Sequence, residues 1–302
     1  MGAQSAFQSQ AGASNLSICL GVEAQPAQFE GELAGQRVQS PLACAFLSPR
    51  LTPLPAGTAS KPFPSDLSAQ GEAELEQIRY PFRAAHGPQG SSFEFPRVAR
   101  LSVANDGSFA HLSQVSADPA LWLFGPALIL ALARRGVFCL HASAVADSSG
   151  AVLYVAASGA GKSTIARYAS LLGARRLCDD ITPLRWTADG VQVLPQFPQF
   201  KLAVQEIELP QAVPLRRICW LDRSVTTGLT ALPTHVVGRK ILQHTVGAKL
   251  FSPTDLGHHL QFAGALAAAL QRTGGGHALG VPWQPNALDG AMLTALQISL
   301  TL

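Results

Sequence analysis

The stretch Ala151-Val-Leu-Tyr-Val-Ala-Ala-Ser-Gly-Ala-Gly-Lys-Ser163 decides the fold that we expect for this chain. Its first seven residues are nearly all apolar, which is typical of a strand buried on both faces. A glycine-rich turn follows, and a helix-like segment then runs from about Lys162 to Leu172 and ends at Gly173. A buried strand, a glycine-rich turn and a helix in this order predict a loop that binds phosphate.

The turn matches the pattern G-x-x-x-x-G-K-[ST] at its last three positions. It departs from the pattern at Ala156, because the pattern has its first glycine at that position. Glycines in the turn allow backbone N–H groups to point at phosphate oxygens. An alanine at position 156 is compatible with such a loop only if its φ is negative. The residues that we expect to bind the nucleotide are Ser158, Gly159, Ala160, Gly161, Lys162, Ser163 and Thr164.

Two adjacent carboxylates, Asp179 and Asp180, end a short apolar strand after this helix. One of them can face Mg²⁺ while its neighbour faces an incoming hydroxyl, which would separate metal binding from proton acceptance. A solvated turn is the alternative interpretation. Asp222, which follows the apolar strand Ile218–Leu221, is a rival metal ligand, and we prefer Asp180 to it.

His141 ends the strand that precedes the loop-bearing strand. If the two strands pair as a hairpin, its imidazole would lie near the phosphates or near Asp179, where it could tune that carboxylate or share its proton. A purely structural histidine is the alternative.

These residues together resemble the catalytic domain of HPr kinase/phosphorylase, whose nucleotide-binding core is shared with phosphoenolpyruvate carboxykinase. The resemblance lies in His141, the loop at 158–163 and the Asp179-Asp180 pair, and it extends through the Pro-rich run Pro195–Leu202. It covers roughly residues 137–205. The whole outline is similar to the HPr kinase-related proteins of bacterial peptide-modification clusters, some of which act on a serine of lasso-type precursor peptides.

The resemblance implies roles for individual residues. Lys162 and the loop backbone would hold the triphosphate of ATP or another nucleoside triphosphate. Ser163 and Asp180 would hold Mg²⁺. Asp179 would take the proton from the substrate hydroxyl, with His141 supporting it.

An arginine usually steadies the phosphate that is being transferred. Arg239 is our candidate for that role, with Arg217 and Arg223 as alternatives. The expected function is thus an ATP- and Mg²⁺-dependent kinase that phosphorylates a hydroxyl, preferably of serine, on a peptide or small protein. A small-molecule kinase on the same core, or a nucleotide-binding regulatory module without catalysis, are the alternatives.

Composition limits the partners and the compartment. Only 14% of the 302 residues are charged, and the 22 basic and 19 acidic residues give a net charge of +3 without a basic stripe, which argues against nucleic acid as a partner. The N-terminus lacks the pattern of a signal peptide, and the longest apolar run, Pro119–Ala133, is too short to span a membrane. We expect a cytoplasmic protein that is able to form a homo-oligomer. Five widely spaced cysteines indicate free thiols: Cys19, Cys44, Cys139, Cys178 and Cys219.

The expected fold class is α+β or α/β, in three parts. Residues 1–15 form a disordered tail, 16–118 a β-rich domain that helps to recognise the substrate, and 119–302 an HPr kinase-like P-loop domain. The turn Asn105-Asp106-Gly107 predicts a hairpin. Longer helices are expected from Gly125 to Arg135, from about Ser252 to Gly274, and from near Asn286.

Overall fold

The computed structural model describes two compact units. The N-terminal unit contains the described residues up to Phe138 together with 247–258, and the C-terminal unit contains 139–246 and the described residues from His259 onward. The described residues are 66–67, 69–75, 78–113, 118–195, 197–198, 212–224, 228–280, 294, 296–297 and 299–300, with the backbone of the strands at 16–20, 29–33, 36–40 and 47–49. The predicted tail at 1–15 and the start of the helix near Asn286 lie outside them.

The N-terminal unit is built on a nine-stranded sheet with the strand order β4-β2-β3-β1-β9-β8-β7-β6-β5. The predicted hairpin around residues 105–107 is confirmed, because the strands on either side of it pair antiparallel. The strands are β1 (Leu16–Leu20), β2 (Phe29–Leu33), β3 (Gln36–Ser40), β4 (Leu47–Pro49), β5 (Ala69–Leu75), β6 (Ile78–Gly87), β7 (Gly90–Phe95), β8 (Ala99–Ala104) and β9 (Phe109–Ser113).

A kinked helical segment packs with this sheet. It consists of α2 (Pro119–Trp122), the π-helical turn η1 (Leu123–Ala127) and α3 (Leu128–Arg134). The kink lies at Gly125, whose φ of −92° and ψ of −107° are not helical, because Pro126 has no N–H to continue the helix. Trp122 contacts Phe95 of β7 with ring centroids 4.6 Å apart. Through such contacts this segment belongs to the N-terminal unit, and the division between the compact units falls between residues 138 and 139.

A buried ion pair joins α3 to the first turn of α6 (Pro253–Thr273) within the N-terminal unit. The Arg134 guanidinium contacts the Asp255 carboxylate at 3.1 Å, and both side chains are buried. Arg134 also donates to the carbonyl of Val103 and to the hydroxyl of Ser91. Because the charges are paired and bonded on several sides, their burial is tolerated.

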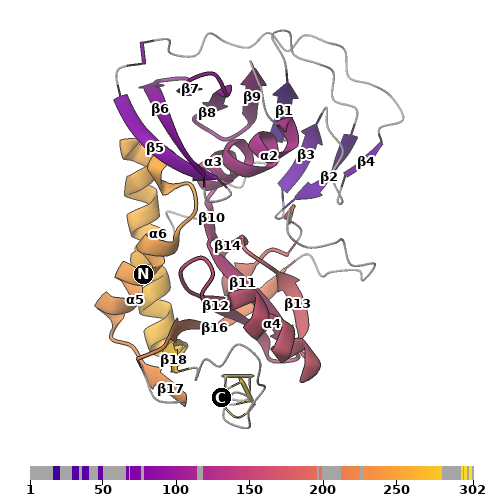
Figure 1. Ribbon diagram of the computed structural model, residues 1–302, viewed down its shortest axis with the longest axis vertical. Coiled ribbons are helices and arrows are strands. Elements are labelled where there is room, and N and C mark those ends of the chain that lie inside the picture. Colours follow the sequence, from indigo (N-terminus) through magenta and orange to yellow (C-terminus); the bar gives the residue numbers. More distant parts are fainter. Residues whose placement is uncertain are drawn as a thin grey trace. The chain divides into compact units, whose positions relative to one another are not determined.

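The C-terminal unit contains a mixed sheet with the order β10-β14-β15-β16-β12-β11-β13, to which β18 adds beside β16 and β17 beside β18 (Figure 1). β12 runs parallel to β16 and antiparallel to β11, and all of its residues are buried, as predicted. The strands are β10 (Val137–Leu140), β11 (Ala142–Asp147), β12 (Gly150–Val155), β13 (Arg175–Cys178), β14 (Thr182–Thr187), β15 (Gly190–Val193), β16 (Val213–Asp222), β17 (Gly228–Ala231) and β18 (Gly276–Gly280).

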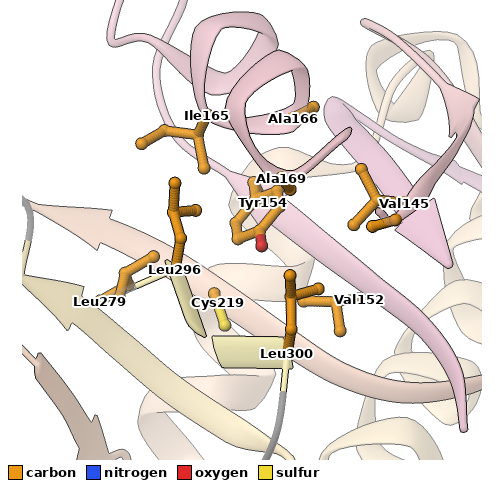
Figure 2. Close-up of a cluster of buried hydrophobic side chains, with 11 residues drawn as sticks. Val145, Val152, Tyr154, Ile165, Ala166, Ala169, Cys219, Leu279, Leu296 and Leu300 are labelled. Atoms are coloured by element: carbon orange, nitrogen blue, oxygen red, sulfur yellow. The ribbon is translucent and has the colours of Figure 1, made fainter. Parts of the chain in front are cut away.

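Helix α4 (Lys162–Leu171) packs its apolar face on this sheet. Figure 2 shows Ile165 and Ala169 of α4 above Tyr154 of β12, with Leu296 and Leu300 beside them. The last described residues therefore complete the same core as α4, and the Tyr154 hydroxyl bonds the hydroxyl of Ser299 at 2.9 Å.

Three further elements lie between β17 and β18 in the chain: α5 (Thr234–His244), the 3₁₀ turn η2 (Ala248–Leu250) and α6. α6 matches the helix predicted from Ser252-Pro253 to Gly274, whereas α5 was not predicted. None of the helices in the described ranges is both long and apolar enough to cross a membrane. The fold is a mixed α/β fold with two β-rich sheets.

Candidate functional site

The glycine-rich turn connects β12 to α4 and takes the conformation that its sequence requires. Gly159 and Gly161 have φ values of +74° and +99°, which glycine adopts without the clash of a side chain. Gly161 is the N-cap of α4, so the first N–H groups of that helix adjoin the turn. Ala156 has no positive φ, which was the condition for accepting alanine at the first loop position.

Lys162 opens α4 and lies against the turn. Its side chain is buried, and Nζ donates to the carbonyl of Ala156 at 3.0 Å and to the carbonyl of Ala157 at 3.2 Å. Ser163, the next residue, is exposed, and Thr164 is half-buried. The turn thus has a lysine ammonium beneath it and a hydroxyl at its outer side.

Asp179 is buried and has both carboxylate oxygens engaged. The hydroxyl of Ser143 on β11 donates to Oδ1 at 2.6 Å, and Nη2 of Arg176 donates to Oδ2 at 3.1 Å. β11 and β13 pair antiparallel, which brings Ser143 alongside the end of β13. Asp179 therefore ties the two strands together.

Asp180 faces a different partner. Its Oδ1 lies 3.0 Å from Nε2 of His141, and about a third of each side chain is exposed. The two carboxylates have different partners, and the imidazole pairs with Asp180 and not with Asp179. The reason is the backbone of Asp180, whose φ of +82° turns the side chain away from that of its neighbour. Such a φ is uncommon for any residue other than glycine.

His141 stands between β10 and β11. The strand that leads to it, β10, lies beside β14 and not beside β12, so the expected hairpin of these two strands is wrong, and it is β11, which follows His141, that pairs with β12. Its backbone N–H donates to the carbonyl of His244 at 2.8 Å. The N–H of Val246 donates to the carbonyl of Cys139, also at 2.8 Å. The C-terminal end of α5 is thereby bonded to the strand that leads into the site.

The sequence contained a signal for α5 that was missed. Val237 and Ile241 are four residues apart and are the buried residues of this helix, which is the spacing of an amphipathic helix. The same helix brings Lys240 and His244 toward the site. Burial and, after it, the nearby charges of His141, Lys240 and Lys162 together lower the pKa of His244 from 6.5 to about 4.

The three arginines that the sequence offered for the transferred phosphate lie in different surroundings. Arg239 is exposed on α5. Arg217 is buried, and its Nη1 donates to the carbonyl of Ser299 at 2.8 Å, which commits it to the packing of the C-terminal segment. Arg223 lies in the turn after β16.

Asp222, the alternative metal ligand, stabilises the turn that follows β16. Its Oδ1 accepts from both the N–H and the hydroxyl of Ser224, at 2.9 Å and 2.6 Å. These bonds lower the pKa of Asp222, with a smaller contribution from the charge of Lys240. The contacts give no reason to prefer Asp222 to Asp180.

The described cysteines are free and buried, as predicted for Cys139, Cys178 and Cys219. Burial raises the pKa of Cys178 and of Cys219 to about 12, so these thiols stay protonated and unreactive at neutral pH. The side chains of Cys19 and Cys44 are outside the described residues.

Comparisons with known proteins add one finding. No protein-family model matches the chain, and no curated protein matches it. Among solved structures, it is similar to the HPr(Ser) kinase/phosphatase of Coxiella burnetii, with 12% identity and a TM-score of 0.26 over 53% of this chain and 87% of that one. At that TM-score no property passes from that protein to this chain, and the residues of the site must support any function.

Proposed function

We propose that this chain is a kinase that uses ATP, or another nucleoside triphosphate, with Mg²⁺ to phosphorylate a hydroxyl group, preferably of serine, on a peptide or small protein. One observation carries the proposal: the contact of His141 with Asp180 in the unit that also contains the β12–α4 turn and Lys162. A phosphate-binding turn alone is compatible with many nucleotide-binding proteins. A partly exposed carboxylate–imidazole pair in the same unit adds a group that can receive a proton.

The turn between β12 and α4 would bind the β- and γ-phosphates. Its left-handed glycines and the first N–H groups of α4 supply donors, and the helix N-terminus supplies partial positive charge. Lys162 would add a full positive charge from beneath. Ser158, Ala160 and Thr164 complete the segment that we assign to the nucleotide.

The contacts favour a division of roles between the two carboxylates that differs from the one expected from the sequence. Asp179 is held on both oxygens by Ser143 and Arg176 and is buried, so a substrate hydroxyl has no access to it. Asp180 reaches solvent and contacts His141. We assign proton acceptance to Asp180 with the support of His141, and we assign to Asp179 the positioning of β13.

Magnesium fits the oxygen donors of this region. Mg²⁺ prefers oxygen ligands and usually takes one or two from the protein, the rest from water and phosphate. The exposed Ser163 hydroxyl is such a donor, and Asp180, to which proton acceptance is assigned here, is left out of the metal ligands. When bound, Mg²⁺ would neutralise charge on the phosphates.

The proposed transfer requires few groups. The hydroxyl oxygen of the substrate forms a bond to the γ-phosphorus as the bond from that phosphorus to the bridging oxygen of the diphosphate breaks. The hydroxyl proton passes to the Asp180 carboxylate, and the leaving diphosphate keeps the bonding electron pair. Positioning and charge neutralisation account for most of the acceleration in such reactions.

Two substitutions test the proposal when they are measured side by side. Lys162→Met should weaken binding of a fluorescent ATP analogue at least tenfold, because the charge beneath the turn is lost. Asp180→Asn should leave that binding within about twofold and reduce phosphate transfer at least a hundredfold, as loss of a general base does. Asp189→Asn, in an exposed turn, is the matched control and should behave like the unsubstituted chain.

The class of substrate is identified by measuring phosphate transfer to a set of candidate substrates. The chain is incubated with serine-containing peptides or with small hydroxyl metabolites, ATP and Mg²⁺, and mass spectrometry detects the added phosphate. Phosphorylated metabolites without phosphorylated peptides would replace the proposal with a small-molecule kinase. ATP binding with no phosphorylated product from either set would indicate a nucleotide-binding module without catalysis.

A further inference from the structure

Helix α5 carries two stripes of polar residues with different surroundings. His235, Arg239 and Gln243 follow one another at intervals of four residues, and all three are exposed. Lys240 and His244 are also four residues apart and are half-buried. Residues at this interval lie on the same side of a helix. Arg239 therefore faces solvent, whereas Lys240 and His244 face the body of the C-terminal unit.

The half-buried stripe is fixed next to the candidate site. The carbonyl of His244 accepts the N–H of His141 at 2.8 Å, and Leu140 bridges to Thr245. His141 is the residue that contacts Asp180. The last turn of α5 thus has a defined place beside the carboxylate–imidazole pair, and Lys240 lies one turn back along the same stripe.

Basic groups from three elements gather at this point. His141 is bonded to His244 through the backbone, Lys240 shares the half-buried stripe of α5 with His244, and the charges of His141, Lys240 and Lys162 add to the effect of burial in lowering the pKa of His244. Among the described residues Lys240 forms no ion pair. The carboxylate that senses its charge, Asp222, is held mainly by Ser224. His244 itself is uncharged at neutral pH, so the positive charge at this point comes from Lys162 and Lys240, and a site with two lysines is suited to an anion.

We propose that Lys240, with His244 beside it, binds the terminal phosphate of the nucleoside triphosphate and takes the place that the sequence suggested for Arg239. This inference rests on the proposed function, because it assumes that the triphosphate lies along the turn above Lys162. In this arrangement the Lys162 ammonium neutralises the β- and γ-phosphates at the turn, and Lys240 on α5 contacts the γ-phosphate. Charge on the outer oxygens of that phosphate is what a second cation stabilises during transfer.

The terminal phosphate is the difference between ATP and ADP, so the two nucleotides form the test. Binding of ADP and of an ATP analogue with a non-hydrolysable NH bridge is measured by calorimetry with Mg²⁺ for the full chain. Lys240→Met should weaken binding of the triphosphate about tenfold, the effect of losing one charge-assisted contact, and change binding of ADP less than twofold. Lys240→Arg should restore most of the loss. Lys249→Met, at an exposed position on η2, is the control and should leave both affinities unchanged.

The outcomes separate this inference from the function. Equal losses for ADP and the analogue, or no loss for either, would overturn the role of Lys240 while an active kinase remained possible. A selective loss for the analogue in a chain that transfers no phosphate to any substrate would support the phosphate site and reject the kinase. If the unsubstituted chain bound neither nucleotide, both proposals would fail together.

Discussion

Asp180 holds a backbone conformation that costs an ordinary residue about 1–2 kcal/mol relative to glycine. Unfavourable backbone conformations often persist at functional sites, where the surrounding structure imposes them. Here the conformation turns the carboxylate toward His141, and the neighbouring Asp179 turns toward Ser143 and Arg176. The φ of one residue thus decides which carboxylate is exposed.

Glycine and alanine at position 180 give the first prediction. Both substitutions remove the contact with His141, but only glycine relieves the backbone. We expect Asp180→Gly to be more stable than Asp180→Ala by about 1 kcal/mol, measured by urea denaturation. This reverses the usual order, in which alanine is the more stable by about 0.5–1 kcal/mol. At Asp189, whose φ is not positive, the usual order should hold, and the same order at both positions would contradict the assignment.

Ser143 gives a second prediction at this scale. Ser143→Ala removes the hydroxyl that donates to Oδ1 of the buried Asp179 at 2.6 Å, and loss of a hydrogen bond to a buried charged group costs about 1.5–3 kcal/mol. Ser149→Ala removes a hydroxyl donor to Asp147 in an exposed turn. It should lower the free energy of unfolding by only a few tenths of the loss expected for Ser143→Ala. Urea denaturation of both variants compares the two losses. Equal losses would show that Asp179 does not depend on Ser143.

The sequence indicated which residues belong to the candidate site, but it did not indicate which of them contact one another. The turn, Lys162, the carboxylate pair and His141 were all recognisable, because the residue types and their order carry the signal. The pairing of His141 with Asp180 was not recognisable. It depends on a backbone angle in the short connection between β13 and β14, and aspartate is compatible with both signs of φ.

At the scale of elements, strands and helices with strong apolar patterns were predicted and weaker ones were missed. β12, α4 and α6 follow long apolar or amphipathic stretches, and the structure confirms them. β5 was missed because its residues, Ala69–Leu75, are mostly small or charged. α5 was missed although Val237 and Ile241 mark its buried face, because Gly238 and the β-branched valines weaken the helical pattern.

His259 links α6 to the end of α5 and gives a prediction about pH. Its Nε2 lies 2.7 Å from the hydroxyl of Thr245, and burial lowers the pKa of His259 from 6.5 to about 4. As pH falls from 6.5 to 4, the unfolded chain takes up a proton that the folded chain does not. This residue therefore destabilises the fold progressively in that window, and the loss is complete below pH 4.

Replacing the residue isolates this contribution from those of the other histidines. His259→Gln keeps a polar partner for Thr245 and does not titrate. The free energy of unfolding, measured from pH 7.5 to 4, should decrease less steeply in the variant than in the unsubstituted chain, with the difference confined to pH below about 6.5. His258→Gln, the adjacent half-buried histidine, is the control and should leave the slope unchanged. Parallel curves for all three proteins would refute the assignment.

At the scale of the whole molecule, each compact unit combines segments that are far apart in the sequence. The sequence suggested a change near residue 118, where the β-rich pattern gives way to an apolar helix. That helical segment packs instead with the strands before it, through Trp122 on Phe95 and Arg134 on Val103. The stretch 247–258, far along the chain, returns to the same unit through Asp255. Contacts between distant segments of this kind have no local signature in a sequence.

The final prediction concerns the two units separately. In each unit, one substitution should destabilise mainly the elements of that unit. Arg134→Ala leaves Asp255 as an unpaired buried charge, at a cost of about 3–5 kcal/mol. Leu296→Ala opens a cavity beside Tyr154 and Ile165, at a cost of about 2–5 kcal/mol. Hydrogen–deuterium exchange with mass spectrometry should show faster exchange in β7, β8 and α3 for the first variant, and in β12 and α4 for the second. If Leu296→Ala accelerated exchange in β7 and β8 as strongly as in β12 and α4, the last described residues would not belong to the core in which they lie in Figure 2.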